Sequence, residues 1–132
     1  KMTNPDDHIV LPETISKEPL GPVVRQGDAV WEDIVRWSLN VMIEAEEYGI
    51  SSSNADAMKT SENPAIKRLV GTEGELGSYL GLDQDWSLNI ITQVGNYGES
   101  YKRNIADTGI LPDRGPNNIW TKGGLLYTPP AR

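Results

Sequence analysis

The side chains of this sequence that could act as acids, bases or metal ligands are few. His8 is the only histidine, so a Ser-His-Asp triad could use no other base, and its short apolar run favours a structural or exposed role. Carboxylates cluster at Asp6-Asp7 and again at Glu44, Glu46 and Glu47. A calcium loop would alternate Asp residues around a central Gly and end on a distal Glu, a spacing that the sequence lacks. We therefore expect solvated acidic clusters, and we assign no catalytic and no metal-binding residue.

Glycine and tryptophan also suggest chemistry that their surroundings do not support. The glycines of residues 71–81 lack the Gly-Lys-Ser/Thr ending and the preceding strand of a phosphate-binding loop. Trp31, Trp37 and Trp86 could stack on a sugar or a base, but their helical spacing favours a place in the core. Trp120 lies in an irregular tail and is the one tryptophan open to another role.

Composition excludes several classes of function. The chain has 132 residues, no cysteine and a net charge of −7. Without cysteine there is no disulfide and no thiolate metal site. The negative charge argues against nucleic-acid binding, which needs clustered Lys and Arg. No apolar run approaches the length that spans a membrane, and the absence of an apolar N-terminal segment argues against a retained signal peptide.

Hydrophobic periodicity predicts two long helices. The first should begin at the N-cap Asp28 and run to about Tyr48, with Gly49 as the residue that ends it. The second should span residues 85–107, with Gly95 and Gly98 inside it allowing another backbone to approach closely. Each carries an apolar stripe at spacings of three and four residues: Val30, Ile34, Trp37, Val41 and Ala45 in the first, and Trp86, Ile90, Val94, Tyr97, Tyr101 and Ile105 in the second.

Shorter elements lie between and after these helices. Asn63 and Pro64 form a start signal for a short helix to Leu69, and single turns are expected at residues 54–59 and 75–80. The proline-containing tail after Gly109 should be irregular and should depend on docking for its order.

The first 27 residues predict an extended connection. Apolar runs at residues 8–11 and 20–25 flank a proline-containing stretch. Pro12, Pro19 and Pro22 fix φ and hold the residues before them extended. Such a segment is stiff without being helical, which suits a link between two bodies.

Several motifs resemble one protein family. Residues 11–28 (LPETISKEPLGPVVRQGD) are similar to the segment by which amino-acid-binding proteins of bacterial ABC importers cross back from their second lobe to their first. Residues 31–37 (WEDIVRW) resemble the helix that follows this crossover. Residues 93–99 (QVGNYGE) and 120–132 are similar to the closing part of the general L-amino-acid-binding proteins of Gram-negative bacteria. The resemblance covers nearly the whole chain, from about Pro5 to Arg132.

The resemblance implies a fold class and a division of the chain. The expected class is α/β: an α-rich C-terminal fragment of a type II periplasmic binding protein, with two long helices, the crossover strand and no complete lobe sheet. Residues 1–16 would end the second lobe, residues 17–27 would form the crossover strand, and residues 28–132 would form the helical part of the first lobe with a family-specific extension. The hinge would lie in the crossover, at Lys17, Glu18, Pro19, Leu20 and Gly21.

The function implied is capture of L-amino acids in the periplasm for import by an ABC permease, without enzymatic activity and without a cofactor. Expected partners are the amino acid, the permease subunits, and the missing N-terminal part or a second copy of this chain. The family's ligand contacts would lie upstream of Lys1. Arg25 and Asp28 carry the charges that an amino acid needs, but their positions suit a strand terminus and a helix cap, so no ligand residue is assigned.

Two alternatives stay open. One is a truncated, self-associating module that has lost ligand binding. The other is a fragment of a dehydratase-like enzyme that reuses the same cleft, although the residues present are not arranged for acid–base chemistry.

Overall fold

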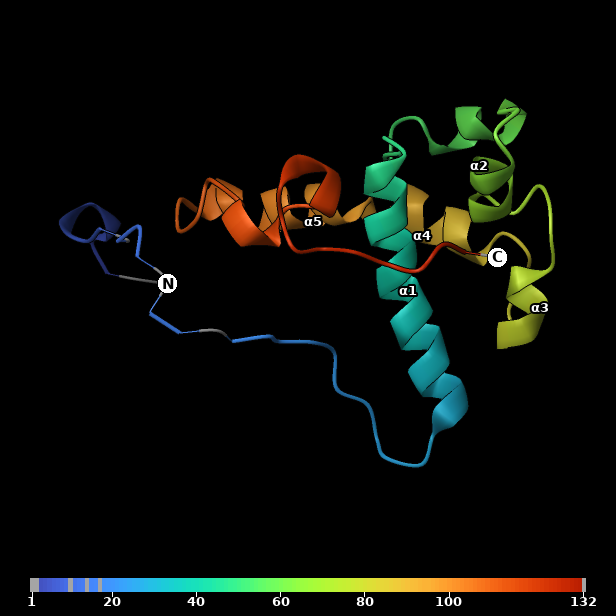
Figure 1. The fold of residues 1–132 in the computed structure, drawn as a ribbon, viewed down its shortest axis with the longest axis horizontal. Helices are drawn as coiled ribbons and strands as arrows, with labels where there is room; N and C mark the ends of the chain where they lie inside the picture. Colours follow the sequence, from blue (N-terminus) through green and yellow to red (C-terminus); the bar gives the residue numbers. More distant parts are fainter. Residues whose placement is uncertain (1–2, 10, 14, 17, 132) are drawn as a thin grey trace.

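The computed structural model describes residues 3–9, 11–13, 15–16 and 18–131, and its regular elements there are helices (Figure 1). The α-helices are α1 (Ala29–Glu47), α2 (Pro64–Leu69), α3 (Leu76–Leu80), α4 (Trp86–Val94) and α5 (Tyr97–Asn104). Short 3-10 turns lie at Pro5–Asp7, Ala55–Thr60, Ala106–Thr108, Gly115–Asn117 and Trp120–Lys122. These described residues contain no β-strand, and a single isolated bridge joins Ile119 to Leu126.

The predicted crossover strand is therefore not observed as a strand. Its described part, residues 18–27, runs mostly irregular and extended along one side of the molecule, away from the helices (Figure 1). The physical reason is the lack of a partner, because a strand exists only where a neighbouring backbone pairs with it.

Helix α1 has the ends that the sequence predicts. Asp28 caps its first turn, with a carboxylate oxygen 3.1 Å from the amide nitrogen of Trp31. Gly49 adopts a left-handed conformation with φ +68° after the last turn. The N–H groups of Gly49 and Ile50 donate to carbonyls of that turn at 3.1 and 2.7 Å, which completes a Schellman motif. The predicted short helix from Pro64 to Leu69 is also confirmed.

The second long helix predicted over residues 85–107 is wrong, because the chain breaks between α4 and α5. Gly95 has φ +91° and ψ 176°, a conformation that cannot continue a helix. Asn96 then starts α5 with a reciprocal capping box. Its side chain accepts from the N–H of Glu99 at 2.9 Å, and the Glu99 carboxylate accepts from the N–H of Asn96 at 2.8 Å. The apolar stripe predicted for one long helix is thus divided between α4 and α5.

The loop after α1 supports this break. The Asn96 amide donates to the carbonyl of Ile50 at 2.7 Å, and the N–H and hydroxyl of Ser52 donate to the Glu99 carboxylate at 3.0 and 2.6 Å. Burial raises the pKa of Glu99, but the hydrogen bonds from Ser52 and Asn96 and the charge of Arg103 outweigh it and hold that pKa below its ordinary value.

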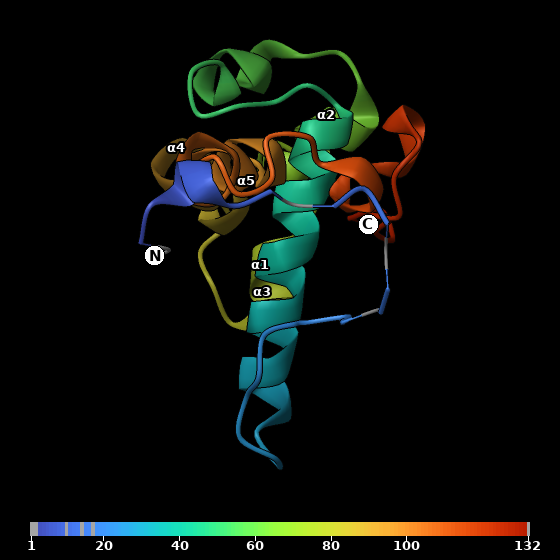
Figure 2. The ribbon, with the colours of Figure 1, turned by 90° about the vertical axis from the view of Figure 1, so that its left-hand side faces the viewer.

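The core lies around the C-terminal half of α1. Helix α1 contacts α3, α4 and α5. The buried cluster joins residues of α1, α2 and α4 with residues of the loops and the C-terminal tail: Val41, Ala45, Ile50, Ala55, Leu69, Val70, Trp86, Leu88, Ile91 and Ala131. The first turns of α1 extend beyond this cluster (Figure 2). Val30 and Trp31 remain 66% and 51% exposed there, so the predicted core position of Trp31 is wrong in this chain.

Residues 114–131 form a C-terminal strap that crosses α1 (Figure 1). Glutamates at the end of α1 hold it by accepting three hydrogen bonds: Arg114 to Glu46 at 2.5 Å, the Trp120 indole to Glu47 at 3.1 Å, and the Ala131 N–H to Glu44 at 3.0 Å. The predicted solvated face is wrong for this cluster, since Glu44 and Glu46 are only 3% and 8% exposed. The tail is irregular and docked, as predicted.

Arg114 anchors the strap through its planar charge. Its guanidinium carbon lies 5.6 Å from the ring centre of Tyr97 and 5.3 Å from that of Tyr101. Lys122 adds a second cation 3.5 Å from the carboxylate of Glu46. Gly98 of α5 leaves room for the ion pair between Arg114 and Glu46, because an added Cβ would lie 3.0 Å from the Glu46 carboxyl group and 3.1 Å from the Arg114 guanidinium. The close approach predicted at this glycine is thus made by side chains and not by another backbone.

Glu44 differs from Glu46 because no described cation pairs with it. Burial and, to a smaller extent, the charge of Glu47 raise the pKa of Glu44. The hydrogen bond from Ala131 and the charge of Arg68 lower it, but the resulting pKa is above its ordinary value. The folded-state pKa therefore exceeds the unfolded one. The stabilising contribution of this group is complete below the unfolded pKa and is lost as the pH rises through the folded pKa.

Replacing Asn96 should cost more stability than removing an ordinary helix cap. Asn96→Ala removes the capping bond and also strands the carbonyl of Ile50, so we expect a loss of about 2–3 kcal/mol in the free energy of unfolding. Asn63→Ala, at the exposed N-cap of α2, removes only a cap and should cost about 1 kcal/mol. Urea denaturation measures both, and equal losses would show that the bond to Ile50 does not support the break.

Replacing Glu44 should change how stability depends on pH. Glu44→Gln keeps an acceptor for the Ala131 N–H and removes the charge. We subtract the free energy of unfolding of the unchanged protein from that of the variant. This difference should increase by on the order of 1 kcal/mol as the pH rises from about 4 to 7. Denaturation across this range measures the difference. The exposed Glu73→Gln is the control and should show no such trend. If the free energies of unfolding of Glu44→Gln and the unchanged protein change with pH in parallel, a raised pKa of Glu44 in the folded state is contradicted.

Candidate functional site

We define residues 3–28 as the N-terminal arm, which contains the predicted hinge. Lys17 lies outside the described residues. Glu18, Pro19, Leu20 and Gly21 lie in the exposed, extended middle of the arm, where Leu20 is 93% exposed. The described backbone bonds of the arm are local: Asp7 to Asn4, Leu20 to Glu18, Asp28 to Arg25, and Glu32 of the first turn of α1 to Asp28. The four described hinge residues thus lie together in one exposed segment, and no other described helix packs on them.

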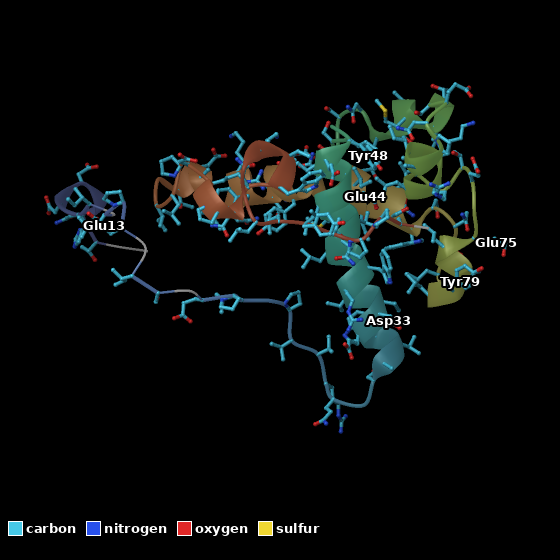
Figure 3. The ribbon with its side chains drawn as sticks, in the orientation of Figure 1. Glu13, Asp33, Glu44, Tyr48, Glu75 and Tyr79 are labelled. Atoms are coloured by element: carbon cyan, nitrogen blue, oxygen red, sulfur yellow. The ribbon has the colours of Figure 1, made fainter. Side chains whose placement is uncertain are left out.

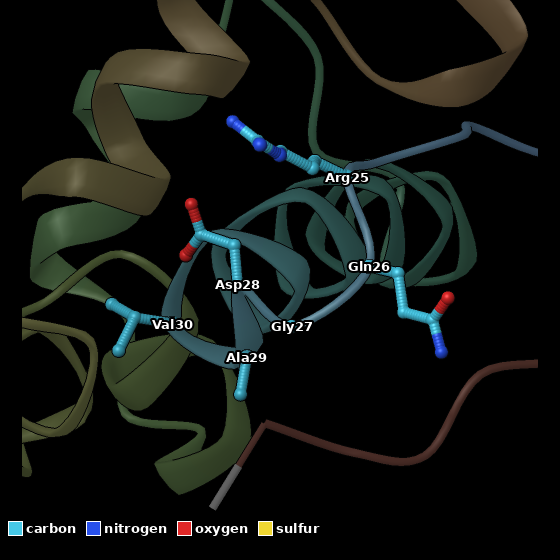
Figure 4. Close-up of a pocket in the computed structure, with 6 residues that line it drawn as sticks. All are labelled: Arg25, Gln26, Gly27, Asp28, Ala29 and Val30. Carbon is cyan, nitrogen blue, oxygen red and sulfur yellow. The ribbon is translucent and has the colours of Figure 1, made fainter.

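Arg25 and Asp28 do not form an amino-acid site in this chain. They line an open hollow at the start of α1 together with Gln26, Gly27, Ala29 and Val30 (Figure 4). The side chains of Arg25 and Gln26 point to opposite sides of the chain, so the hollow does not enclose a ligand. Asp28 serves as the helix cap that the sequence predicts.

The remaining titratable candidates are placed apart. Asp6 and Asp7 are exposed in the turn Pro5–Asp7, and His8 is exposed with Nδ1 3.1 Å from the carbonyl oxygen of Asn4. The acids Glu44, Glu46 and Glu47 accept hydrogen bonds from the strap at the C-terminal end of α1, where Figure 3 labels Glu44. Among the described residues, no group of three or more His, Cys, Asp and Glu side chains could hold a metal ion.

One feature missed from the sequence is a small apolar pocket where α1, α3 and α4 meet. Its lining residues are Trp37, Leu76, Tyr79, Leu80 and Trp86, and its volume is about 140 Å³. Trp86 is buried and Trp37 is partly buried against the core, as predicted, whereas Tyr79 of α3 is 81% exposed (Figure 3). The Trp86 indole N–H is buried without a hydrogen-bond partner among the described residues. This volume is well below the roughly 300–1,000 Å³ of small-molecule sites.

Within the described part of the chain, no helix is both long enough and apolar enough to span a bilayer. The geometry offers a docked helical part and an exposed extended arm, and the hollow at the start of α1 does not enclose a ligand.

No family model matches the sequence. Curated proteins, in contrast, do match it. The general L-amino acid-binding periplasmic protein AapJ of Rhizobium johnstonii is 54% identical over 99% of this chain, and the glutamate/glutamine/aspartate/asparagine-binding protein BztA of Rhodobacter capsulatus is 52% identical over 99% of it. The chain spans 39% of the length of each.

A solved structure gives the same result for the fold. It is described as an ABC transporter / periplasmic binding protein from Brucella ovis with glutathione bound. The two chains are 55% identical, and their TM-score is 0.90 over 98% of this chain and 41% of the other. These homologues are solute-binding transport proteins and not enzymes. Over almost all of its length, the chain is homologous to part of the periplasmic binding proteins of amino-acid ABC transporters.

Proposed function

We propose that this chain is part of a substrate-binding protein that captures L-amino acids in the periplasm and delivers them to the membrane permease of an ABC importer. The observation that carries the proposal is the 54% identity, over 99% of this chain, to a protein named as a general L-amino acid-binding periplasmic protein. The names of the two other homologues support ligands with an α-amino and an α-carboxylate group, since acidic and amide amino acids and glutathione all carry them.

Within such a protein, we propose that residues 17–27 form a connection between two lobes and that Lys17, Glu18, Pro19, Leu20 and Gly21 form the hinge. Residues 1–16 would end one lobe, and residues 28–132 would belong to the other. The exposed, extended course of the described hinge residues supports this division. Pro19 and Pro22 stiffen the segment, so closure would be absorbed at its ends.

We further propose that the ligand contacts lie outside this sequence. An amino acid needs a carboxylate-binding donor set and an ammonium-binding acid set facing one cavity. Arg25 and Asp28 carry the required charges, but they line an open hollow in which Asp28 is engaged as a helix cap. The helical part would thus act as a scaffold for a site completed elsewhere.

Calorimetry on two proteins tests the proposed function. One is this chain alone, and the other is a chimera in which this sequence replaces the matching stretch of the Rhizobium johnstonii relative. The chimera should bind at least one of the twenty L-amino acids with a dissociation constant of about 1 μM or tighter, about −8 kcal/mol, whereas the isolated chain should show no such binding.

Two results would contradict the proposal. A folded chimera that binds none of the twenty would refute amino-acid capture. Micromolar binding by the isolated chain would refute the external site, and Arg25→Ala would then test whether the hollow at the start of α1 is responsible.

A further inference from the structure

The end of the strap, residues 127–131, is joined to the rest of the molecule by one described hydrogen bond. The N–H of Ala131 donates to the Glu44 carboxylate at 3.0 Å. The Thr128 hydroxyl donates only to the carbonyl of the next residue, and the two prolines before Ala131 have no N–H to donate. No other described hydrogen bond links this segment to a helix or to the earlier part of the strap. Its attachment therefore depends on Glu44.

Docking places this segment against the C-terminal half of α1. Ala131 is buried and belongs to the apolar cluster that contains Val41 and Ala45 of α1, and Thr128 is buried as well. The burial of so few side chains gains little, while fixing the backbone of five residues costs about 1–2 kcal/mol for each residue. The docked and detached forms of the segment are thus close in free energy, and one bond decides between them.

The earlier part of the strap, residues 114–126, has attachments that do not involve Glu44. The N–H of Leu126 donates to the carbonyl of Asn118 at 3.0 Å, and Arg114 pairs with Glu46. This part can therefore stay docked when residues 127–131 detach.

Glu44 is poorly placed to carry a charge while the segment is docked. It is buried, accepts one described hydrogen bond, and forms no described ion pair. Removing a carboxylate from water costs several kcal/mol unless hydrogen bonds and an opposite charge compensate. Residues 127–131 supply neither a cation nor a second donor to this carboxylate.

The ionisable groups around Glu44 do not remove this cost. Glu47, one turn later in α1, opposes its ionisation, and the neighbouring Tyr48 is neutral (Figure 3). Arg68 of α2 favours ionisation without forming a described ion pair. Helix α4 has no ionisable residue, Tyr79 of α3 is exposed, and the charged residues of α5 bond to other partners. Burial is the largest effect, so the pKa of Glu44 lies above its ordinary value in the docked form.

We propose that Glu44 is a pH-dependent latch, which holds residues 127–131 on α1 while its carboxyl group is protonated and releases them as that group ionises. The protonated carboxyl keeps an oxygen that accepts from the N–H of Ala131, whereas the ionised group gains water when the segment detaches. Because the pKa is higher in the docked form, docking is fully favoured below the pKa of the detached form and weakens as the pH rises through that of the docked form. This inference does not depend on the proposed function.

Hydrogen exchange of the full chain, followed by NMR between about pH 5 and 8, tests the latch. Each rate is divided into that of an unstructured peptide at the same pH, which gives the protection of each amide. The protection of Ala131 should fall by about 10-fold over this range. That of Leu126 should stay constant within about twofold, because its bond to Asn118 does not involve Glu44.

Two variants should change the latch in opposite directions. Glu44→Gln keeps an acceptor for Ala131 and cannot ionise, so the protection of Ala131 should no longer depend on pH. Arg68→Met removes the positive charge that favours ionised Glu44, so the fall in protection should be about threefold larger than in the unchanged chain. The buried Nε of Arg68 has no described hydrogen-bond partner, so this variant breaks no bond there.

The contrary outcomes overturn the proposal. Protection of Ala131 that is independent of pH in the unchanged chain would show that no latch exists. An equal fall at Leu126 would show that the whole strap loosens, and a fall that persists in Glu44→Gln would assign the pH dependence to another group. A smaller fall in Arg68→Met would contradict the electrostatic cause, and this variant decides the question even if Glu44→Gln does not fold.

Discussion

Helix α1 ends in three glutamates that accept hydrogen bonds from the last eighteen described residues of the chain. Glu46 binds the guanidinium of Arg114, Glu47 binds the indole of Trp120, and Glu44 binds a backbone N–H near the end of the strap. The strap has almost no regular structure of its own, so without these acceptors the cost in conformational entropy of ordering it would not be offset. By docking, it brings Ala131 into the core and covers that end of α1.

The opposite end of α1 has no such cover within the described residues. Its first turns and the arm that precedes them expose apolar side chains and open backbone groups. The two halves of this helix thus differ: the C-terminal half is packed by this chain, and the first turns are left exposed by the described residues. This asymmetry agrees with a chain that spans 39% of the length of its curated relatives.

Local signals in the sequence predicted part of this arrangement correctly. Asp28, Gly49 and the Asn63-Pro64 pair act through the backbone of their own turns, so the ends of α1 and α2 could be predicted from neighbouring residues alone. The resemblance of residues 11–28 to a lobe crossover led to the family that the homologues show.

Features that depend on distant residues were not predictable in the same way. The stripe of residues 86–105 keeps its helical spacing across Gly95, which hides the local signals for a break at Gly95 and Asn96. The bonds from Asn96 to Ile50 and from Ser52 to Glu99, which support the break, join residues about 46 positions apart. The glutamate cluster looks solvated until the strap supplies its donors from about seventy to ninety residues away. Trp31 has the spacing of a core residue, yet the described residues leave it 51% exposed.

Limited trypsin digestion of the isolated chain, followed by mass spectrometry, tests most directly the claim that the body closes on its own strap while the arm stays exposed. The structure predicts early cleavage in the arm, after Arg25, and slow cleavage in the strap after Arg114, because the Arg114 side chain is only 15% exposed and is paired with Glu46. Cleavage after Arg114 as fast as after Arg25 would contradict the account.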